Sequence, residues 1–229
     1  MSWWLVSFSR HGPARYLSHL DTSRVVQRTF ARAGVPIALS QGMRPKPRVS
    51  LPLPLPVGAA GADELATVEV PKGVEAGASA LRALREASPP GMEMVGIVDV
   101  GEVHPRPQPR AAEYVCLLDG DAGAIGAAVE RYSDTEHAIR ERVSPKGVRR
   151  LDLKEYVGDV VATAVEGGAR LGFTIFHRQD GAARPQELID LIAEWARVEP
   201  VMRSLERRRV TWDHGLPSPA AGRRKESST

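Results

Sequence analysis

The sequence has little cysteine, few aromatic residues and no long apolar run. Cys116 is the one cysteine among 229 residues. A single thiol excludes an internal disulfide framework, and also an iron–sulfur cluster or a thiolate zinc site built from this chain alone. No stretch reaches the roughly 18 apolar residues that a membrane span needs, and the first residues lack an export pattern. We therefore expect a cytoplasmic protein with no membrane partner, no cofactor and no metal.

Acidic residues are almost absent from residues 1–50, where Asp21 is the single acid against eight cations. This region carries a net charge of +7 and the whole chain +3, so the remaining residues sum to −4. A charge concentrated in this way indicates an anionic partner, with nucleic acid first among them, and says nothing about fold. The cations are Arg10, Arg15, Arg24, Arg28, Arg32, Arg44, Lys46 and Arg48.

The first half of the chain alternates apolar strand patterns with helical patterns. Ser18 and Asp21 have the spacing of a capping box at a helix start, and Gly34 with Pro36 ends that helix. The proline-rich run at 48–56 indicates an edge strand or an extended polyproline segment. We expect strands at 3–8, 35–39, 64–70 and 92–100, and helices at 19–33 and 75–87.

The second half repeats this alternation of strand and helix patterns. We expect strands at 113–118, 138–143, 151–153, 156–165, 170–176 and 208–212, and helices at 122–131 and 185–196. Gly167-Gly168 is a strong signal for a two-residue hairpin turn. The predicted fold is α+β, with two tandem ferredoxin-like (βαββαβ) domains. They cover residues 1–100 and 111–214, with a linker at 101–110 and a disordered basic tail at 215–229.

The first predicted helix separates into two faces. Val26 and Phe30 fall on one side at about 100° per residue, and His19 shares their azimuth, at the buried edge of the first turn. Three arginines at every fourth position form a stripe on the other side. A solvated helix face explains such a stripe. An anion-binding face explains it as well, because basic loops lie at both ends of the helix.

The loop at 40–47 is a second candidate anion-binding segment. Alternating prolines keep its backbone extended and remove N–H donors, so its cations project from a stiff ribbon that suits a phosphate backbone. The alternative is a surface connection whose charge only aids solubility. The candidate nucleic-acid-binding residues are Arg10, Arg15, Arg24, Arg28, Arg32, Gln41, Arg44, Lys46 and Arg48.

Taken together, these motifs resemble the radical-SAM-linked proteins of unknown function, a domain found alone or behind a radical S-adenosylmethionine domain. The resemblance rests on 15–21 (Arg-Tyr-Leu-Ser-His-Leu-Asp), Arg28, 32–36, 40–42, Pro45, Pro47, 52–53, 146–147, 151–153 and Tyr156. Met43 stands where the family usually has an aromatic residue. The resemblance implies a context of RNA metabolism, but no reaction. Because Cys116 cannot hold the iron–sulfur cluster of the radical enzyme, it implies a stand-alone accessory module.

Three functions are compatible with this sequence. The first is an accessory protein that binds tRNA or rRNA, with a radical SAM protein or another RNA-processing enzyme as its partner in trans. The second is a metal-independent endoribonuclease, resembling those that process CRISPR repeats, with His19 as general base and Tyr16 or Ser18 orienting it. The third is a protein-interaction module. Burial in a strand is the expected state of Trp3 and Trp4, so they are not expected to stack on bases.

Overall fold

The computed structural model describes residues 1–145, 147–199 and 201–213. The predicted basic tail at 215–229 lies outside the described residues. The described chain divides into two compact units, one formed by Met1–Pro109 with Trp212 and Asp213, and one by Arg110–Thr211. Both are mixed α+β. None of the helices in the described part of the chain combines the length and apolar character needed to cross a membrane.

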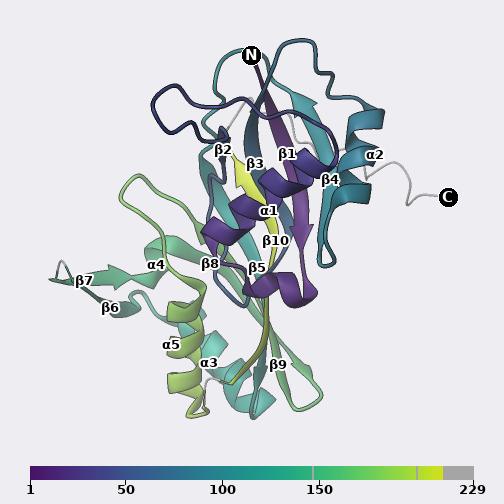
Figure 1. The fold of residues 1–229 in the computed structure, drawn as a ribbon. Helices are drawn as coiled ribbons and strands as arrows, with labels where there is room; N and C mark the ends of the chain where they lie inside the picture. The colour runs from purple at the N-terminus through teal and green to yellow at the C-terminus, as the bar shows by residue number, and fades with distance from the viewer. Residues whose placement is uncertain (146, 200, 214–229) are drawn as a thin grey trace. The chain divides into compact units, whose positions relative to one another are not determined.

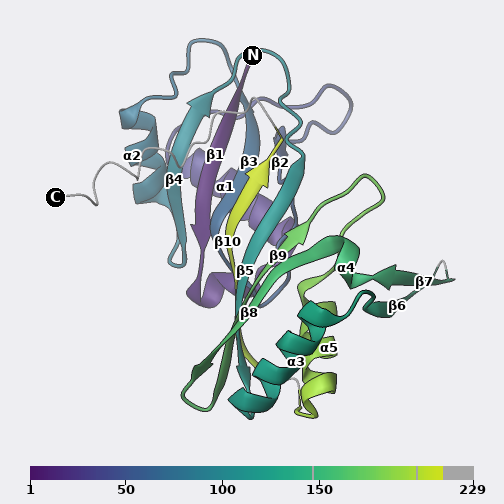
Figure 2. The ribbon, with the colours of Figure 1, turned by 180° about the vertical axis from the view of Figure 1, so that it is seen from behind.

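The first unit has four strands, with two helices on one face of the sheet. The strand order is β4-β1-β3-β2, and all three pairings are antiparallel. Figure 1 shows α1 in front of the strands, and Figure 2, from the opposite side, shows the strands in front of α1. The elements are β1 (Ser2–Arg10), the 3-10 helix η1 (Gly12–Tyr16), α1 (His19–Arg32), β2 (Val49–Ser50), β3 (Ala60–Val70), α2 (Ala78–Ala87) and β4 (Met92–Asp99).

The core of this unit follows from two sequence periods. Every second residue of β1 from Trp4 to Phe8 faces the helices, and Val26 and Phe30 of α1 pack against them. The rings of Trp4 and Phe30 lie 6.3 Å apart between centroids. Leu84 of α2 completes the contact and is fully buried. Each such side chain contributes about 1.5 to 3 kcal/mol on burial, so this face fixes α1 to the sheet.

Both ends of α1 confirm the sequence prediction. The Ser18 hydroxyl accepts the backbone N–H of Asp21 at 3.1 Å. At the other end Gly34 has a φ of +70°, and the Val35 N–H donates to the Phe30 carbonyl at 3.0 Å. A glycine in this left-handed conformation closes the helix without a Cβ clash, so the helix stops before Pro36.

One predicted strand of the first unit is missing, and the run predicted as an edge strand or polyproline segment pairs over only two residues. The segment at 35–39 is not a strand: Leu39 forms an isolated bridge with Pro47, and the Ala38 N–H donates to the Glu69 carbonyl at 2.8 Å. The run at 48–56 pairs only through Val49 and Ser50. Proline supplies no N–H, so alternating prolines leave too few donors for a longer ladder. The result is a long loop between α1 and β2.

The predicted linker at 101–110 packs against the first unit. The His104 ring lies 4.1 Å from the Trp3 ring between centroids, nearly edge-on at 70°. Its Nε2 atom is 3.4 Å from the Thr67 hydroxyl. Arg48 approaches the same indole ring, at 5.3 Å. The proline-rich segment therefore covers the face of β1 that carries Trp3.

We expect the packing of His104 to make stability depend on pH. Desolvation by burial, followed by the charges of Arg106 and Arg48, lowers the pKa of His104 below 6.5. A depressed histidine pKa stabilises the fold above the unfolded pKa, and this contribution is lost as pH falls through the folded pKa. In urea titrations at pH 7 and at pH 5, His104→Gln is expected to lose less stability than wild type. An equal loss in both proteins would contradict this role.

The second unit has the strand order β10-β5-β9-β8, with α3 packed against β8, β9 and α5. Its elements are β5 (Pro109–Asp119), α3 (Ala122–Asp134), β6 (Ile139–Ser144), β7 (Gly147–Asp152), α4 (Leu153–Tyr156), β8 (Val157–Val165), β9 (Gly168–Phe176), α5 (Pro185–Ala196) and β10 (Met202–Trp212). Strands β6 and β7 form a separate two-stranded ribbon. The hairpin between β8 and β9 turns at Glu166-Gly167, one residue earlier than predicted, because Val165 already pairs with Gly168.

Candidate nucleic-acid interface

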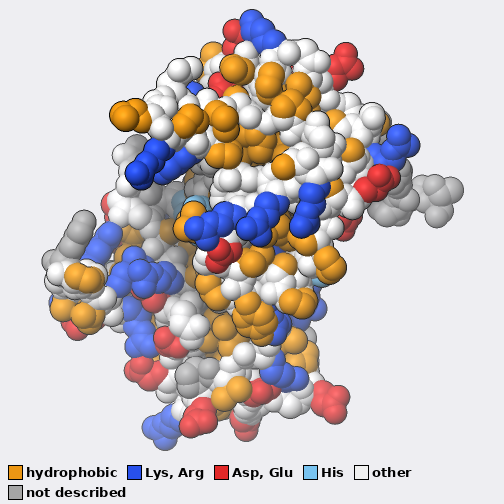
Figure 3. Space-filling model, viewed as in Figure 1, with side chains coloured by type: hydrophobic (Ala, Val, Ile, Leu, Met, Phe, Trp, Pro, Cys, Tyr) orange, Lys and Arg blue, Asp and Glu red, His pale blue; other side chains and the backbone are white. Residues whose placement is uncertain are grey.

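The outer face of α1 presents the predicted arginine stripe to solvent. Arg24, Arg28 and Arg32 are all exposed, on the side of the helix opposite Val26 and Phe30. Figure 3 shows Lys and Arg side chains in a row along α1, with further ones over the loop beside β2. Arg24 forms an ion pair with Asp21 at 3.0 Å. Arg28 and Arg32 have no ion pair or side-chain hydrogen bond to any residue that the structure describes.

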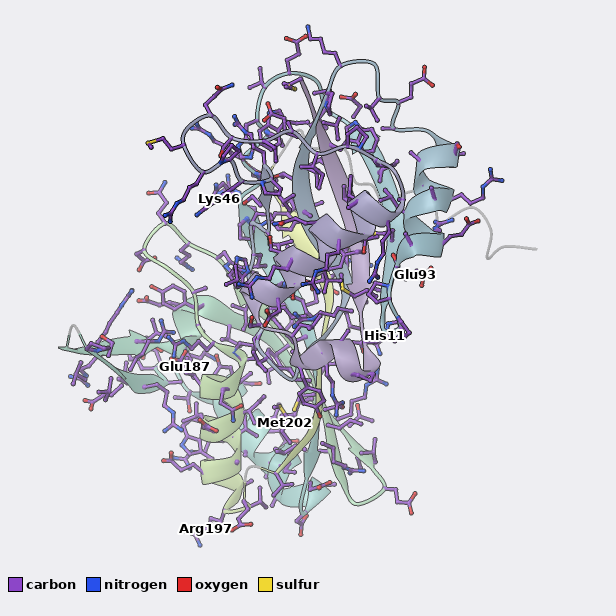
Figure 4. The ribbon with its side chains drawn as sticks, in the orientation of Figure 1. His11, Lys46, Glu93, Glu187, Arg197 and Met202 are labelled. Carbon is purple, nitrogen blue, oxygen red and sulfur yellow. The ribbon has the colours of Figure 1, made fainter. Side chains whose placement is uncertain are left out.

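The loop between α1 and β2 supplies the second group of cations. Arg44 and Lys46 are exposed, and so is the neutral Gln41. Figure 4 labels Lys46 on this loop. Within the described ranges, the side chains of Arg44 and Lys46 have no carboxylate partner. Arg48, immediately before β2, differs, because its guanidinium forms an ion pair with Glu69 at 2.5 Å. The positive charges of Arg44 and Lys46 are therefore not neutralised by a neighbouring carboxylate, whereas that of Arg48 is.

Arg10 is not a surface residue, which corrects the sequence prediction. Its side chain is 1% exposed. The guanidinium donates to the Thr22 hydroxyl at 2.7 Å and to the carbonyls of Leu17, Pro56 and Ala59 at 3.1, 3.3 and 3.5 Å. Arg10 thus ties the loop before α1 to the loop before β3. It holds the interface in place and cannot itself meet a polynucleotide.

Arg15 and Tyr16 form a pair at the end of η1. The Arg15 guanidinium carbon lies 4.7 Å from the centroid of the Tyr16 ring. Tyr16 is 60% exposed, whereas Trp3 and Trp4 are 5% and 0% exposed, as expected of strand residues in a core. Tyr16 is therefore an exposed aromatic surface beside the start of α1.

His19 is exposed, although the helical period placed it at the buried edge of α1. It does lie on the inner side, where it lines a small pocket with Phe8, Arg10 and Thr22. The ring stays open to solvent because it lies in the first turn, at the rim of this pocket. The groups proposed to orient it bond elsewhere: the Ser18 hydroxyl to the Asp21 carboxylate at 2.7 Å, and the Tyr16 hydroxyl to Arg15 at 2.5 Å. The described residues therefore offer no base–orienter pair around His19.

The motif at 151–156 in the second unit has structural partners. The Asp152 carboxylate accepts the backbone N–H groups of Ala138 and Lys154 at 2.9 and 3.1 Å, and so caps α4. The buried Tyr156 hydroxyl bonds to the Asp180 carboxylate, and this bond raises the pKa of Tyr156. The motif is thus accounted for by local structure.

Sequence reasoning missed the charged residues that anchor the β6–β7 ribbon. Arg142 forms two bonds with the Glu187 carboxylate, at 2.7 and 2.8 Å, and Glu187 lies on α5 (Figure 4). Arg140 similarly pairs with Glu194 at 2.6 Å. Alternation along β6 puts Arg140 and Arg142 on the same face, and that was the available signal. Nor is Cys116 a reactive group, since burial raises its pKa to about 12.

Comparison with known proteins places the chain within one family. The model of the family described as an uncharacterized protein conserved in bacteria, DUF2344, matches residues 4–185. No curated protein matches the chain. Among solved structures, a chain titled "Crystal Structure of a Cbf5-Nop10-Gar1 Complex" is similar, with 15% identity and a TM-score of 0.49. The match covers 90% of this chain and 48% of that chain, about half its length.

Proposed function

The chain belongs to this family of proteins conserved in bacteria, and we propose that it is an RNA-binding protein that assists an RNA-processing enzyme. The proposed binding surface consists of the outer face of α1 and the loop that follows it. Its residues are Arg24, Arg28, Arg32, Gln41, Arg44 and Lys46, with Arg15 and Tyr16 beside the start of the helix.

One observation carries this proposal. Arg28, Arg32, Arg44 and Lys46 are exposed, and none of them is paired with a carboxylate among the described residues. Other arginines of this chain, among them Arg48, have acidic partners. Unpaired cations on a helix and its adjoining loop are the usual footprint of a phosphate-binding surface, and arginine forks bind phosphate bidentately.

We expect Arg28→Glu to weaken RNA binding about tenfold, because it replaces a phosphate contact with a repulsive charge. The slope of log K against log salt should fall by about one. Binding of tRNA, with heparin as a polyanion control, would be measured at about 50 and 200 mM salt. Lys46→Glu should show a similar loss if the loop belongs to the same surface.

Arg82→Glu is the matched control. Arg82 is an exposed helical arginine on α2, outside the proposed surface, and undergoes the same change of charge. It should bind tRNA nearly as wild type does. Equal losses in Arg28→Glu and Arg82→Glu would reduce the effect to net charge and overturn the proposed surface. Binding by wild type that does not weaken with salt would contradict a phosphate-reading mode.

The role beside an enzyme is inferred from the resemblance described above. We propose that the bound RNA, a tRNA or an rRNA, is presented to an enzyme in trans, and a radical SAM protein is the partner class that the resemblance implies. Co-purification of such an enzyme only in the presence of RNA would support this arrangement. RNA-independent association would favour the protein-interaction module instead.

The endoribonuclease alternative is favoured by the pocket beside His19, which is also lined by Arg10, Thr22 and Glu64. An imidazole at its rim could act as general base on a ribose hydroxyl. Analysis of the RNA after the binding assay tests this directly. Cleavage by wild type that is lost in His19→Ala would make the protein an enzyme, whereas intact RNA would leave it a binding protein.

We also propose that both units are ferredoxin-like. The orders β4-β1-β3-β2 and β10-β5-β9-β8 support this, since each places the first strand of a unit between the fourth and the third. In the second unit the β6–β7 ribbon would then be an insertion between α3 and β8. In such units the helices cover one face of the sheet, so the outer face of α1 points to solvent.

A further inference from the structure

The loop between α1 and β2 contains a finger that is closed at its base. The Ser40 N–H donates to the Lys46 carbonyl at 2.8 Å, and the Lys46 N–H donates to the Ser40 hydroxyl at 3.0 Å. Below these bonds, Leu39 and Pro47 form an antiparallel bridge. Residues 41–45, here called the finger, are therefore held at both ends.

Met43 lies at the tip of the finger and is as exposed as in an extended peptide, at 103%. The adjacent Gly42 has a φ of +121°, a conformation that glycine adopts without strain. A methionine side chain gains about 1.5 to 3 kcal/mol when it is fully buried, and here none of that is gained within the described fold. Because the loop is closed and holds the apolar Met43 side chain in water, this side chain is placed to be buried by a binding partner.

The charges around Met43 indicate what the partner is. Arg44 and Lys46 flank the tip, and no acidic residue occurs between Asp21 and Asp63. An apolar pocket on a protein offers no counter-charge for such flanks by itself. A nucleic-acid strand offers both requirements at close range, since its bases provide apolar faces and its phosphates bind the cations.

We propose that Met43 inserts between neighbouring bases of a bound RNA strand while Arg44 and Lys46 hold the adjoining phosphates. This deepens the proposed function and rests on it. Apolar wedges, methionine among them, open a base step in this way. The preferred substrate is unpaired RNA, because the bases of single strands and loops are accessible, whereas those of an A-form duplex are largely stacked within it.

The test uses a short single-stranded oligoribonucleotide in which alternate purines are 2-aminopurine, whose fluorescence rises when the base is unstacked. Wild type and Met43→Leu are expected to raise the fluorescence on binding, since both carry a large apolar side chain. Met43→Ser should lose most of this rise and bind about tenfold more weakly, with its salt dependence unchanged. The same RNA in a duplex should be bound equally by all three proteins.

The possible outcomes separate this inference from the function on which it rests. A fluorescence rise with Met43→Ser that equals the wild-type rise would overturn insertion. So would steeply salt-dependent binding by wild type without any rise, which leaves the basic surface intact and points to a protein partner for the tip. Failure of wild type to bind any RNA would overturn both proposals.

Discussion

Replacing Arg10 with methionine is expected to lower the free energy of unfolding by about 3 to 5 kcal/mol. The guanidinium is buried and donates to a hydroxyl and three carbonyls from separate loops. Methionine fills much of the volume but leaves these acceptors without the guanidinium donor. Urea titration followed by tryptophan emission reports the loss, because Trp3 and Trp4 lie on the same strand.

The control for Arg10 is Arg82→Met, which removes an exposed arginine and should change stability by less than about 0.5 kcal/mol. Arg10→Lys should fall between the two, since an ammonium retains the charge but cannot reach carbonyls on both sides with a planar fork. The free energy of unfolding, and not RNA affinity, is the quantity to compare, because Arg10 acts through the position of the loops. A stability of Arg10→Met within error of wild type would contradict the anchoring role.

The burial of Arg10 could be predicted from the sequence only in part. Its position was predictable in part, since alternation along β1 puts it on the face of Trp4, Val6 and Phe8. Its partners were not, because the carbonyls of Pro56 and Ala59 are far away in sequence and carry no side-chain signal. A count of charges therefore assigned it to the surface, and only the folded chain shows that these loops close around it.

The net charge of residues 1–50 also overstates the free positive charge, because Arg48 is paired with an acidic residue. Residues 1–50 sum to +7, yet Glu69 lies outside that window and faces Arg48 across the sheet. The pairing of Val49 with Val68 brings the two residues together. Helix periodicity, by contrast, is local, so the stripe on α1 and its buried face could be read directly. The best predicted part of the interface is thus the part whose geometry depends on neighbours along the chain.

Replacing Phe30 with alanine is expected to lower the free energy of unfolding by about 3 to 5 kcal/mol, the range for large aromatic residues in a core. Phe30 is fully buried and its ring lies 6.3 Å from that of Trp4. The cavity would lie between α1 and the sheet, where it weakens the attachment of the helix that carries the arginines. Urea titration detects the loss, with Trp4 as the local reporter of the cavity.

Two milder variants then test whether the faces of α1 act independently. Phe30→Leu keeps most of the volume and should cost no more than about 1.5 kcal/mol, with tRNA affinity unchanged while the protein is folded. Arg28→Ala lies on the outer face and should leave stability within about 0.5 kcal/mol of wild type, while tRNA binding weakens. If Arg28→Ala destabilised the fold as strongly as Phe30→Leu, the stripe would be part of the structural framework. If Phe30→Leu lowers only the stability and Arg28→Ala lowers only the tRNA affinity, the sheet-facing side of α1 stabilises the fold and the solvent-facing side contacts the RNA.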